Sequence, residues 1–284
     1  MRFVRAIIAE YGRNGESMRN LHRILAKVKG VAYEQIVFGS ADIFLTDEEE
    51  AVFRGILDRL EKNEPLSKIL NCRCFWNHEF FVNSHVLDPR QETELIVEMV
   101  LERFDRKSSI NFLDLGTGSG CLLLSLLTEY VHSHGLGIDV SSRAIEVAKY
   151  NKNRLQIPSA NFMTTDWKDF ETKEKFDVII SNPPYIKTDH IALLDECVKN
   201  YDPLLALDGG MSGLDSYHFI SARVNKWMRP GGLIFLEIGY NQTEEVSRIL
   251  LDNNLIILEI RKDLNGIARV ILVSVSYPIP LLNI

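Results

Sequence analysis

The chain has 284 residues, enough for one large domain or two smaller ones, and its 46% hydrophobic and 25% charged residues are typical of a globular protein. Its 32 Lys and Arg against 39 Asp and Glu give a net charge of −7, and the whole deficit lies beyond residue 84, because residues 1–84 carry twelve residues of each sign. Non-specific binding to nucleic acid depends on an excess of Lys and Arg. The composition therefore excludes a general polyanion binder.

The sequence predicts neither a metal site nor a membrane span. Among the four cysteines only Cys72 and Cys74 are close, in a Cys-x-Cys pattern that lacks the paired Cys-x-x-Cys spacing of zinc sites, and His132-x-His134 is an isolated pair. The apolar stretch Ala6–Ala9 is too short for a signal peptide or a membrane helix. We therefore expect no metal, no membrane association and a cytoplasmic protein.

Two amphipathic helices are expected near the N-terminus. Apolar residues recur at helical spacing over Met18–Gly30, and Gly30 suits a helix end. Thr46-Asp47-Glu48-Glu49 is a capping-box pattern, so a second helix is expected from Asp47 to about Lys62. Residues 1–72 are therefore predicted to form a small helical domain.

An aromatic and β-branched stretch follows, from Phe75 to Val86. This composition favours strands, and Asn77-His78 suits a turn, so we expect a short hairpin. The hairpin would make residues 73–88 a linker to a second domain, 89–284.

From residue 89 onward, a helical stretch around Leu95–Val100 is followed by strand and helix patterns in alternation. This alternation predicts a doubly wound α/β domain with a mostly parallel seven-stranded sheet. The short connection Arg261–Ile267 before the last strand suits a hairpin, and hence one antiparallel strand near the sheet edge. The expected strands are Ile110–Leu115, Gly135–Asp139, Ala160–Thr164, Phe176–Ser181, Leu233–Ile238, Leu255–Ile260 and Ala268–Ser274, and the main helices are Cys121–Val131, Ser142–Asn153, Tyr217–Met228 and Thr243–Leu251.

A glycine-rich loop, Gly116-Thr117-Gly118-Ser119-Gly120, follows the first of these strands and opens a helix. Open α/β sheets bind ligands at this position, although a tight turn without a ligand has the same pattern. Asp139 ends the next strand, where a carboxylate can accept hydrogen bonds from both hydroxyls of a ribose. The pair favours a nucleoside site.

Asp114 distinguishes between cofactors. A carboxylate beside the loop would repel the pyrophosphate of a nicotinamide or flavin dinucleotide and attract an ammonium or sulfonium group. The third glycine is Gly120, whereas the dinucleotide fingerprint requires glycine at position 121, which is Cys121. S-adenosylmethionine fits both observations, with S-adenosylhomocysteine as its product, and an oxidoreductase is disfavoured.

The third strand ends close to Asp166-Trp167. The Asp166 carboxylate is placed to accept from an adenine amino group, and the Trp167 indole to pack on the adenine face. Simple core packing explains Trp167 equally well.

Asn182-Pro183-Pro184-Tyr185 begins at the end of the fourth strand, Phe176–Ser181. Two prolines fix the backbone and remove two N–H donors. The Asn182 side-chain oxygen and the Pro183 carbonyl can then accept both hydrogens of a planar NH2 group, while Tyr185 stacks on its plane. Such a site would activate a poorly nucleophilic nitrogen by position and charge. A rigid turn with a packing tyrosine is the structural alternative.

With these motifs, the sequence resembles the HemK-type protein-glutamine methyltransferases, which methylate the glutamine of the Gly-Gly-Gln motif in bacterial peptide chain release factors. The resemblance extends over nearly the whole chain. Besides the two motifs above, it includes Pro89–Glu94, Asp202–Gly210, Gly213-Leu214, Gly231–Gly239, Asp263-Leu264 and Arg269-Val270.

The resemblance implies a small helical N-terminal domain joined by a hairpin to a class I, Rossmann-like S-adenosylmethionine domain. Because the helical domain is separate and has no catalytic motif, we expect it to dock the release factor. It assigns cofactor contacts to the glycine loop, Asp139, Trp167 and Asn182, and substrate contacts to Asn182–Tyr185. Arg90 and Glu94 either shape the wall of the active site or are surface side chains. Where the family usually has Pro-Arg-Pro-Asp-Thr-Glu and Tyr-Ile-Leu-Gly, this chain has Gln91-Glu92 and Lys68-Ile69-Leu70-Asn71.

Two other functions share these motifs. A nucleic-acid methyltransferase acting on an exocyclic amine of adenine or guanine would use the same Asn182–Tyr185 segment, but it must hold an extruded base and its backbone, and the acidic second domain offers no evident cradle. A binding module that has lost its chemistry would be expected to carry a broken motif. We therefore expect a monomeric enzyme whose partner is a release factor and not a nucleic acid.

Overall fold

The computed structural model describes residues 2–13, 17–39 and 43–275 of the chain. The chain divides into two compact units, Met1–Cys72 and Arg73–Ile284, which are described separately below. The expected outer ends of the two domains, residues 1 and 284, lie outside the described residues.

The first unit is mainly helical. Its hydrophobic core is built from helix and strand side chains such as Ile7, Leu21, Ile24 and Phe53. The predicted capping box is present, since Thr46 Oγ1 accepts from Glu49 N at 3.2 Å and Glu49 Oε2 accepts from Thr46 N at 2.8 Å. The elements are β1 (Arg2–Phe3), α1 (Val4–Arg13), α2 (Met18–Lys29), α3 (Tyr33–Gly39), β2 (Phe44–Leu45), α4 (Asp47–Glu61) and α5 (Leu66–Leu70).

A short hairpin opens the second unit, with strands β3 (Arg73–Phe75) and β4 (His78–Phe80). The predicted turn at Asn77-His78 is wrong by one residue, because His78 pairs with Phe75 and the turn is Trp76-Asn77. Trp76 determines this register: its backbone N–H donates to Glu94 at 2.8 Å and its indole N–H donates to Glu129 at 2.7 Å.

The hairpin also ends earlier than Val86, because β4 stops at Phe80. Beyond it, the backbone N–H and C=O of Phe81 are both bound by the Asn151 side chain, at 2.8 and 3.0 Å. The Asn151 side chain thus satisfies the backbone groups that a neighbouring strand would otherwise bind, and the segment after Phe80 is not paired as a strand.

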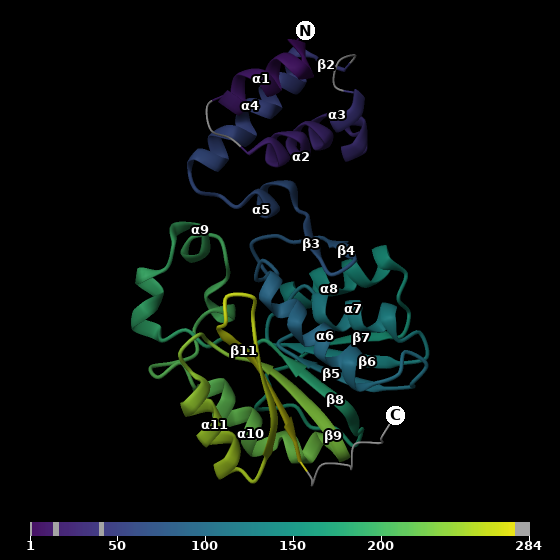
Figure 1. Ribbon diagram of the computed structural model, residues 1–284, viewed down its shortest axis with the longest axis vertical. Helices are drawn as coiled ribbons and strands as arrows, with labels where there is room; N and C mark the ends of the chain where they lie inside the picture. Colours follow the sequence, from purple (N-terminus) through teal and green to yellow (C-terminus); the bar gives the residue numbers. More distant parts are fainter. Residues whose placement is uncertain (1, 14–16, 40–42, 276–284) are drawn as a thin grey trace. The chain divides into compact units, whose positions relative to one another are not determined.

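A seven-stranded sheet forms the centre of the second unit (Figure 1). Its order is β10-β11-β9-β8-β5-β6-β7, and only β11 runs antiparallel to its neighbours, as the short last connection predicts. The strands are β5 (Asn111–Leu115), β6 (His134–Asp139), β7 (Ala160–Thr164), β8 (Phe176–Ser181), β9 (Met228–Glu237), β10 (Ile256–Lys262) and β11 (Ala268–Ser274). The fold class is confirmed.

Alternate side chains of each strand pack on opposite helical layers, as period-two geometry requires. Phe112 of β5 and Phe235 of β9 belong to the core formed with α6 and α7, whereas Leu113 and Leu236 belong to the core formed with α10 and α11. By this alternation Glu237, at the end of β9, faces the same layer as α6. The helices are α6 (Glu94–Arg103), α7 (Cys121–Glu129), α8 (Ser142–Leu155), α10 (Asp215–Trp227) and α11 (Thr243–Asp252).

Strand β9 starts at Met228, five residues before the predicted Leu233, and includes the Pro230-Gly231-Gly232 segment that reads as a loop. Its pairing with β8 is irregular there, with a register shift between Phe176 and Val178. Three short helical segments between β8 and α10 are absent from the sequence-based expectation: η2 (Thr188–Leu193), α9 (Glu196–Lys199) and η3 (Leu204–Ala206). A further short turn, η1 (Gln91–Thr93), precedes α6.

The packing beneath the glycine loop is tight at Gly137 in β6. A Cβ added there would lie 2.6 Å from Thr117 Oγ1 and 2.7 Å from the Phe162 ring. We expect Gly137→Ala to destabilise the second unit by about 1–3 kcal/mol through overpacking. Urea unfolding followed by tryptophan fluorescence measures this, since the three tryptophans, Trp76, Trp167 and Trp227, all lie in that unit.

The control is Gly55→Ala in α4, where no described atom lies within 4 Å of an added Cβ. This change should leave the tryptophan-detected midpoint unaltered while raising the stability of the first unit by about 0.5–1 kcal/mol. An unchanged midpoint in Gly137→Ala would show that the loop tolerates the added methyl group.

Candidate active site

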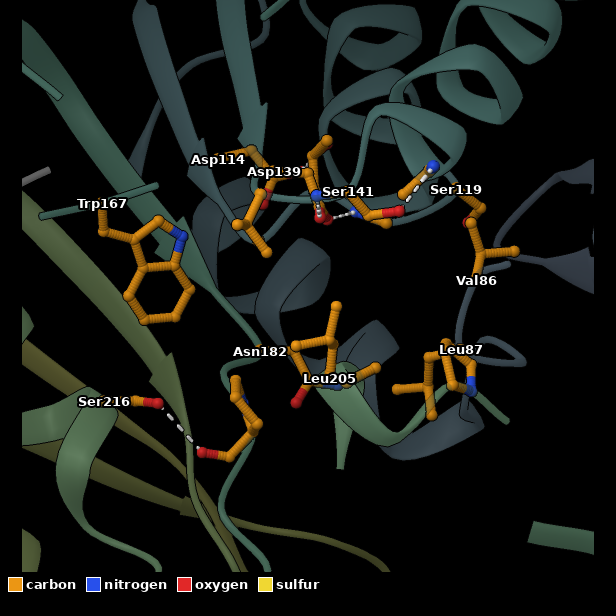
Figure 2. A pocket seen from close by; sticks show the side chains of 18 of the residues that line it. Val86, Leu87, Asp114, Ser119, Asp139, Ser141, Trp167, Asn182, Leu205 and Ser216 are labelled. Atoms are coloured by element: carbon orange, nitrogen blue, oxygen red, sulfur yellow. Dashed lines mark hydrogen bonds between the residues drawn. The ribbon is translucent and has the colours of Figure 1, made fainter. Parts of the chain in front are cut away.

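A cavity of about 360 Å³ lies at the carboxyl ends of β5, β6 and β8 (Figure 2). Because β5 pairs with β6 on one side and β8 on the other, this is the point at which the chain reverses its direction of winding, where doubly wound sheets bind ligands. The structure brings most of the predicted site residues to the cavity wall, namely Arg90, Asp114, Gly116, Thr117, Gly118, Ser119, Asp139, Asp166, Trp167, Asn182 and Pro184.

The glycine loop presents backbone to the cavity. The N–H groups of Gly116 and Thr117 both donate to Ile138 O at 2.9 Å, which ties the loop to β6. Gly116, Gly118 and Gly120 have φ of +75°, +54° and +80°, a region that favours glycine. A Cβ on Gly118 would meet no described atom within 4 Å, so this part of the loop leaves room for a ligand. Gly120 lies behind the wall, packed against Leu124 and Phe162.

Asp139 ends β6 with its carboxylate held by the backbone. Oδ2 accepts from Gly118 N at 3.0 Å and Oδ1 accepts from Ser141 N at 2.9 Å (Figure 2). Burial raises the pKa of this carboxyl above its usual range, although both hydrogen bonds act in the opposite direction. Each oxygen keeps a further lone pair, so the group fits two ribose hydroxyls.

Asp114 lies deeper, fully buried at the end of β5, and accepts from Thr117 Oγ1 at 2.6 Å. Burial raises its pKa to about 7, and the nearby Asp139 charge acts in the same direction. A cation in the cavity would favour the ionised form. The residues at this wall therefore fit a ligand that carries a positive charge next to a ribose, as S-adenosylmethionine does.

Trp167 and Asp166 line the cavity beyond β7. A Cβ on Gly116 would lie 3.1 Å from Trp167 Cζ2, so the indole packs closely on the glycine loop as well as on the core. Asp166 Oδ1 accepts from Lys168 N at 2.9 Å, which fixes the turn after β7. Trp167 therefore packs against the core and also lines the cavity, and its contact with adenine stays a prediction.

The Asn182–Tyr185 segment closes the other side of the cavity (Figure 2). Asn182 Nδ2 donates to Thr93 Oγ1 at 3.1 Å, and the Pro184 carbonyl accepts from Ser216 Oγ at 3.0 Å. The Pro183 carbonyl accepts no hydrogen bond from the described part of the chain. Pro183 itself is buried and Tyr185 is half-buried, and neither forms part of the cavity wall.

Thr93 and Glu237 are among the residues at this site that were not predicted as functional. Thr93 Oγ1 donates to Glu237 Oε2 at 2.6 Å, and Tyr185 OH lies 3.4 Å from Glu237 Oε1. Burial raises the pKa of the Glu237 carboxyl to about 7. The sequence does hold a signal for Glu237, since an acid inside the apolar strand Leu233–Ile238 must be buried with partners.

Arg90 and Glu94 differ in position. Arg90 lies in the cavity wall, where its guanidinium donates to the buried Asp202 at 2.7 Å. Glu94 lies outside the wall, because its carboxylate accepts from Trp76 N in the hairpin turn. Of the two residues, Arg90 therefore lines the cavity, and Glu94 holds the turn of the β3–β4 hairpin.

The parts of the chain that the structure describes hold no group of three or more His, Cys, Asp and Glu side chains suited to a metal ion. In the same parts, no helix combines the length and the apolar character that crossing a membrane requires.

The fold and the cavity define an α/β methyltransferase of the Rossmann-like class. A family model described as a methyltransferase domain matches residues 106–254. A crystal structure of a methyltransferase from Pyrococcus furiosus shares the fold, with a TM-score of 0.54 and 15% identity over 78% of this chain and 98% of that one.

Relatives in sequence identify the family. A release factor glutamine methyltransferase of Caulobacter vibrioides is 39% identical over 229 residues, 80% of this chain and 79% of that protein. Another, of Thermodesulfovibrio yellowstonii, is 36% identical over 275 residues, 96% of this chain and 97% of that protein. The chain belongs to the release factor glutamine methyltransferase family, and it is an enzyme that uses S-adenosylmethionine.

The burial of Asp114 predicts a pH-dependent stability without cofactor. Its pKa is raised from 3.8 to about 7, so its contribution to folding is fully present below pH 3.8 and is lost as the pH rises through about 7. Asn does not titrate. The free energy of unfolding of Asp114→Asn relative to wild type should therefore rise between about pH 4 and pH 7, by at most about 4 kcal/mol, and then level off.

Urea unfolding across that pH range measures the difference. Asp169→Asn, at an exposed position, is the control for loss of a negative charge. A difference between Asp114→Asn and wild type that stays constant with pH would contradict the assignment.

Asp139 is expected to carry much of the affinity for the cofactor. Asp139→Ala removes a charged acceptor, which is worth about 1.5–3 kcal/mol, so the Kd for S-adenosylmethionine should rise about 10- to 100-fold. Isothermal titration calorimetry measures it. Asp169→Ala is the control, because this carboxylate is exposed and lies outside the cavity wall, and an equal loss in the two variants would show that Asp139 has no special role.

Proposed function

We propose that the protein transfers a methyl group from S-adenosylmethionine to the side-chain amide nitrogen of the glutamine in the Gly-Gly-Gln motif of peptide chain release factors. The relatives reported above are named release factor glutamine methyltransferases, which supports the release factor and its glutamine as the substrate. The observation that supports it most directly is the Asn182–Tyr185 segment, which offers acceptors and no competing backbone donors at Pro183 and Pro184.

The chemistry follows from what an amide nitrogen lacks. Its lone pair is delocalised, and hydrogen bonds from both of its hydrogens raise the electron density on nitrogen. Asn182 Oδ1 and the Pro183 carbonyl are the two acceptors, since Asn182 Nδ2 is engaged by Thr93. When bound, S-adenosylmethionine supplies an electrophilic methyl group on a sulfonium.

Orientation of the segment supports catalysis by positioning. Ser216 holds the Pro184 carbonyl, and Gln242 Nε2 donates to the Tyr185 carbonyl at 3.0 Å. These bonds hold the backbone still while the substrate amide binds. No general base is required, because the N-methylated amide is a strong acid until it loses its extra proton.

We propose that the first unit docks the release factor away from the reacting glutamine. It has its own core and presents aromatic side chains to solvent: Phe38 is 86% exposed and Phe3 is 58% exposed. Exposed aromatic groups of this kind are typical of protein contacts. We also propose that the protein is a monomer and that it acts in the cytoplasm, where release factors are synthesised and used.

Methylation of an exocyclic base amine is the disfavoured alternative. It would need a basic surface to hold the nucleic-acid backbone, whereas residues 85–284 carry 20 basic and 27 acidic residues.

Mass spectrometry of a purified bacterial release factor tests the proposal, after incubation with the protein and S-adenosylmethionine. One added methyl group on the Gly-Gly-Gln glutamine is expected. Asn182→Ala should reduce kcat by about 10²-fold or more, because it removes one of two preorganised acceptors.

A control variant shows whether the loss in Asn182→Ala is specific to that position. Asn200→Ala, at an exposed position, should retain full activity. Methylation of an RNA or DNA base, with none on the release factor, would overturn the proposal in favour of the alternative.

A further inference from the structure

We propose that Thr93 and Glu237 are positioning residues that fix which end of the Asn182 carboxamide faces the substrate. The proposal rests on the proposed function for its kinetic test, and on the contacts of the apo site for its structural one. Thr93 and Glu237 come from the turn before α6 and the end of β9, 144 residues apart in sequence, and meet Asn182 at the end of β8.

The first step is the geometry of the chain of hydrogen bonds. Thr93 is 3% exposed and Glu237 is 2% exposed, so both polar side chains are buried. The Thr93 hydroxyl lies 2.6 Å from Glu237 Oε2 and 3.1 Å from Asn182 Nδ2. The Thr93 hydroxyl therefore links the Glu237 carboxylate to the Asn182 carboxamide.

The second step is a count of protons. A hydroxyl has one hydrogen to donate, and an ionised carboxylate can only accept. When Glu237 is ionised, Thr93 must donate to it, and so Thr93 can only accept from Asn182. Nδ2 then points at Thr93, and Oδ1 is left as the acceptor for the substrate amide.

The third step is what protonation of Glu237 would change. A protonated carboxyl can donate to Thr93, whose own hydrogen is then free to bind Asn182 Oδ1. The carboxamide would turn over and present Nδ2, a donor, to the N–H groups of the substrate. Ionised Glu237 therefore selects the productive orientation.

Several charged or titratable groups surround Glu237 and act on this equilibrium. Arg269 from β11 favours the ionised carboxylate, whereas Glu92, on the same turn as Thr93, disfavours it. Tyr185 OH faces Oε1, and Tyr217 from α10 donates to the Glu237 backbone carbonyl at 3.0 Å. Arg269 is held in turn by Asp263 at 2.8 Å.

The kinetic test compares Thr93→Val with Thr93→Ser at saturating S-adenosylmethionine. Valine keeps the shape and removes the hydroxyl, so kcat should fall about tenfold or more, while serine should restore it to within about threefold of wild type. The Kd for S-adenosylhomocysteine should stay within about twofold of wild type in both, which shows an intact cofactor site. Thr128→Val in α7, a matched change whose hydroxyl donates to Ser125 O, should not alter kcat.

A pH profile separates positioning from packing. The ratio of wild-type kcat to Glu237→Gln kcat should rise from about pH 5 to about pH 8, because only the wild-type residue titrates. Any contribution of Asp114 is common to both proteins and cancels in the ratio. A ratio that does not change with pH would overturn the role given to Glu237.

An NMR measurement needs no substrate. In protein labelled with 15N-Asn, the Asn182 side-chain NH2 signal is assigned by its loss in Asn182→Ala. Thr93→Val should speed its hydrogen exchange about tenfold or more, whereas Thr93→Ser should not.

The outcomes are distinguishable. If wild type fails to methylate the release factor, the proposed function fails, and the NMR comparison still decides the orientation of Asn182. If Thr93→Val matches Thr93→Ser in kcat and in exchange, the positioning role is wrong.

Discussion

The site depends on the parallel course of β6, β5, β8 and β9, which brings their carboxyl ends to one edge of the sheet. Parallel strands need crossover connections, so residues far apart in sequence meet only at these ends. Asp139, Asp114, Asn182 and Glu237 each lie at or directly after the end of one of these strands. The cofactor wall and the substrate wall are therefore consequences of one topology.

Two buried carboxyl groups at this edge of the sheet have different surroundings. Asp114 and Glu237 are both fully buried with their pKa raised to about 7, but their partners differ. Asp114 lies in the cavity wall beside the glycine loop, where a bound cation would favour its charge. Glu237 lies behind the wall, where Thr93 links its carboxylate to the Asn182 carboxamide. Burial of an acid usually lowers the free energy of unfolding. Here one buried acid, Asp114, lies on the cofactor side of the cavity, and the other, Glu237, lies on the substrate side.

Local patterns predicted much of this architecture. All seven strands follow from apolar runs, and the capping box of α4 from Thr46–Glu49, because these signals lie within a few residues. The glycine loop and the Asn182–Tyr185 segment were also recognised, since each places unusual backbone directly after a strand. Most of the residues predicted from them line one cavity.

Other features depend on distant partners. The hairpin register is determined by Trp76 bonding to Glu94 and Glu129, which no nearby pattern encodes. The Thr93 hydroxyl has a role only because Glu237, 144 residues away, lies 2.6 Å from it. The short helical segments between β8 and α10 lack the periodicity from which a helix is predicted.

The most direct test of this account is a crystal structure of the protein with S-adenosylhomocysteine and a peptide containing Gly-Gly-Gln. We predict that the glutamine amide nitrogen lies about 3 Å from both Asn182 Oδ1 and the Pro183 carbonyl oxygen, with Asn182 Nδ2 still on Thr93. A glutamine bound through its amide oxygen at this position, or a nitrogen with neither acceptor in reach, would contradict the account.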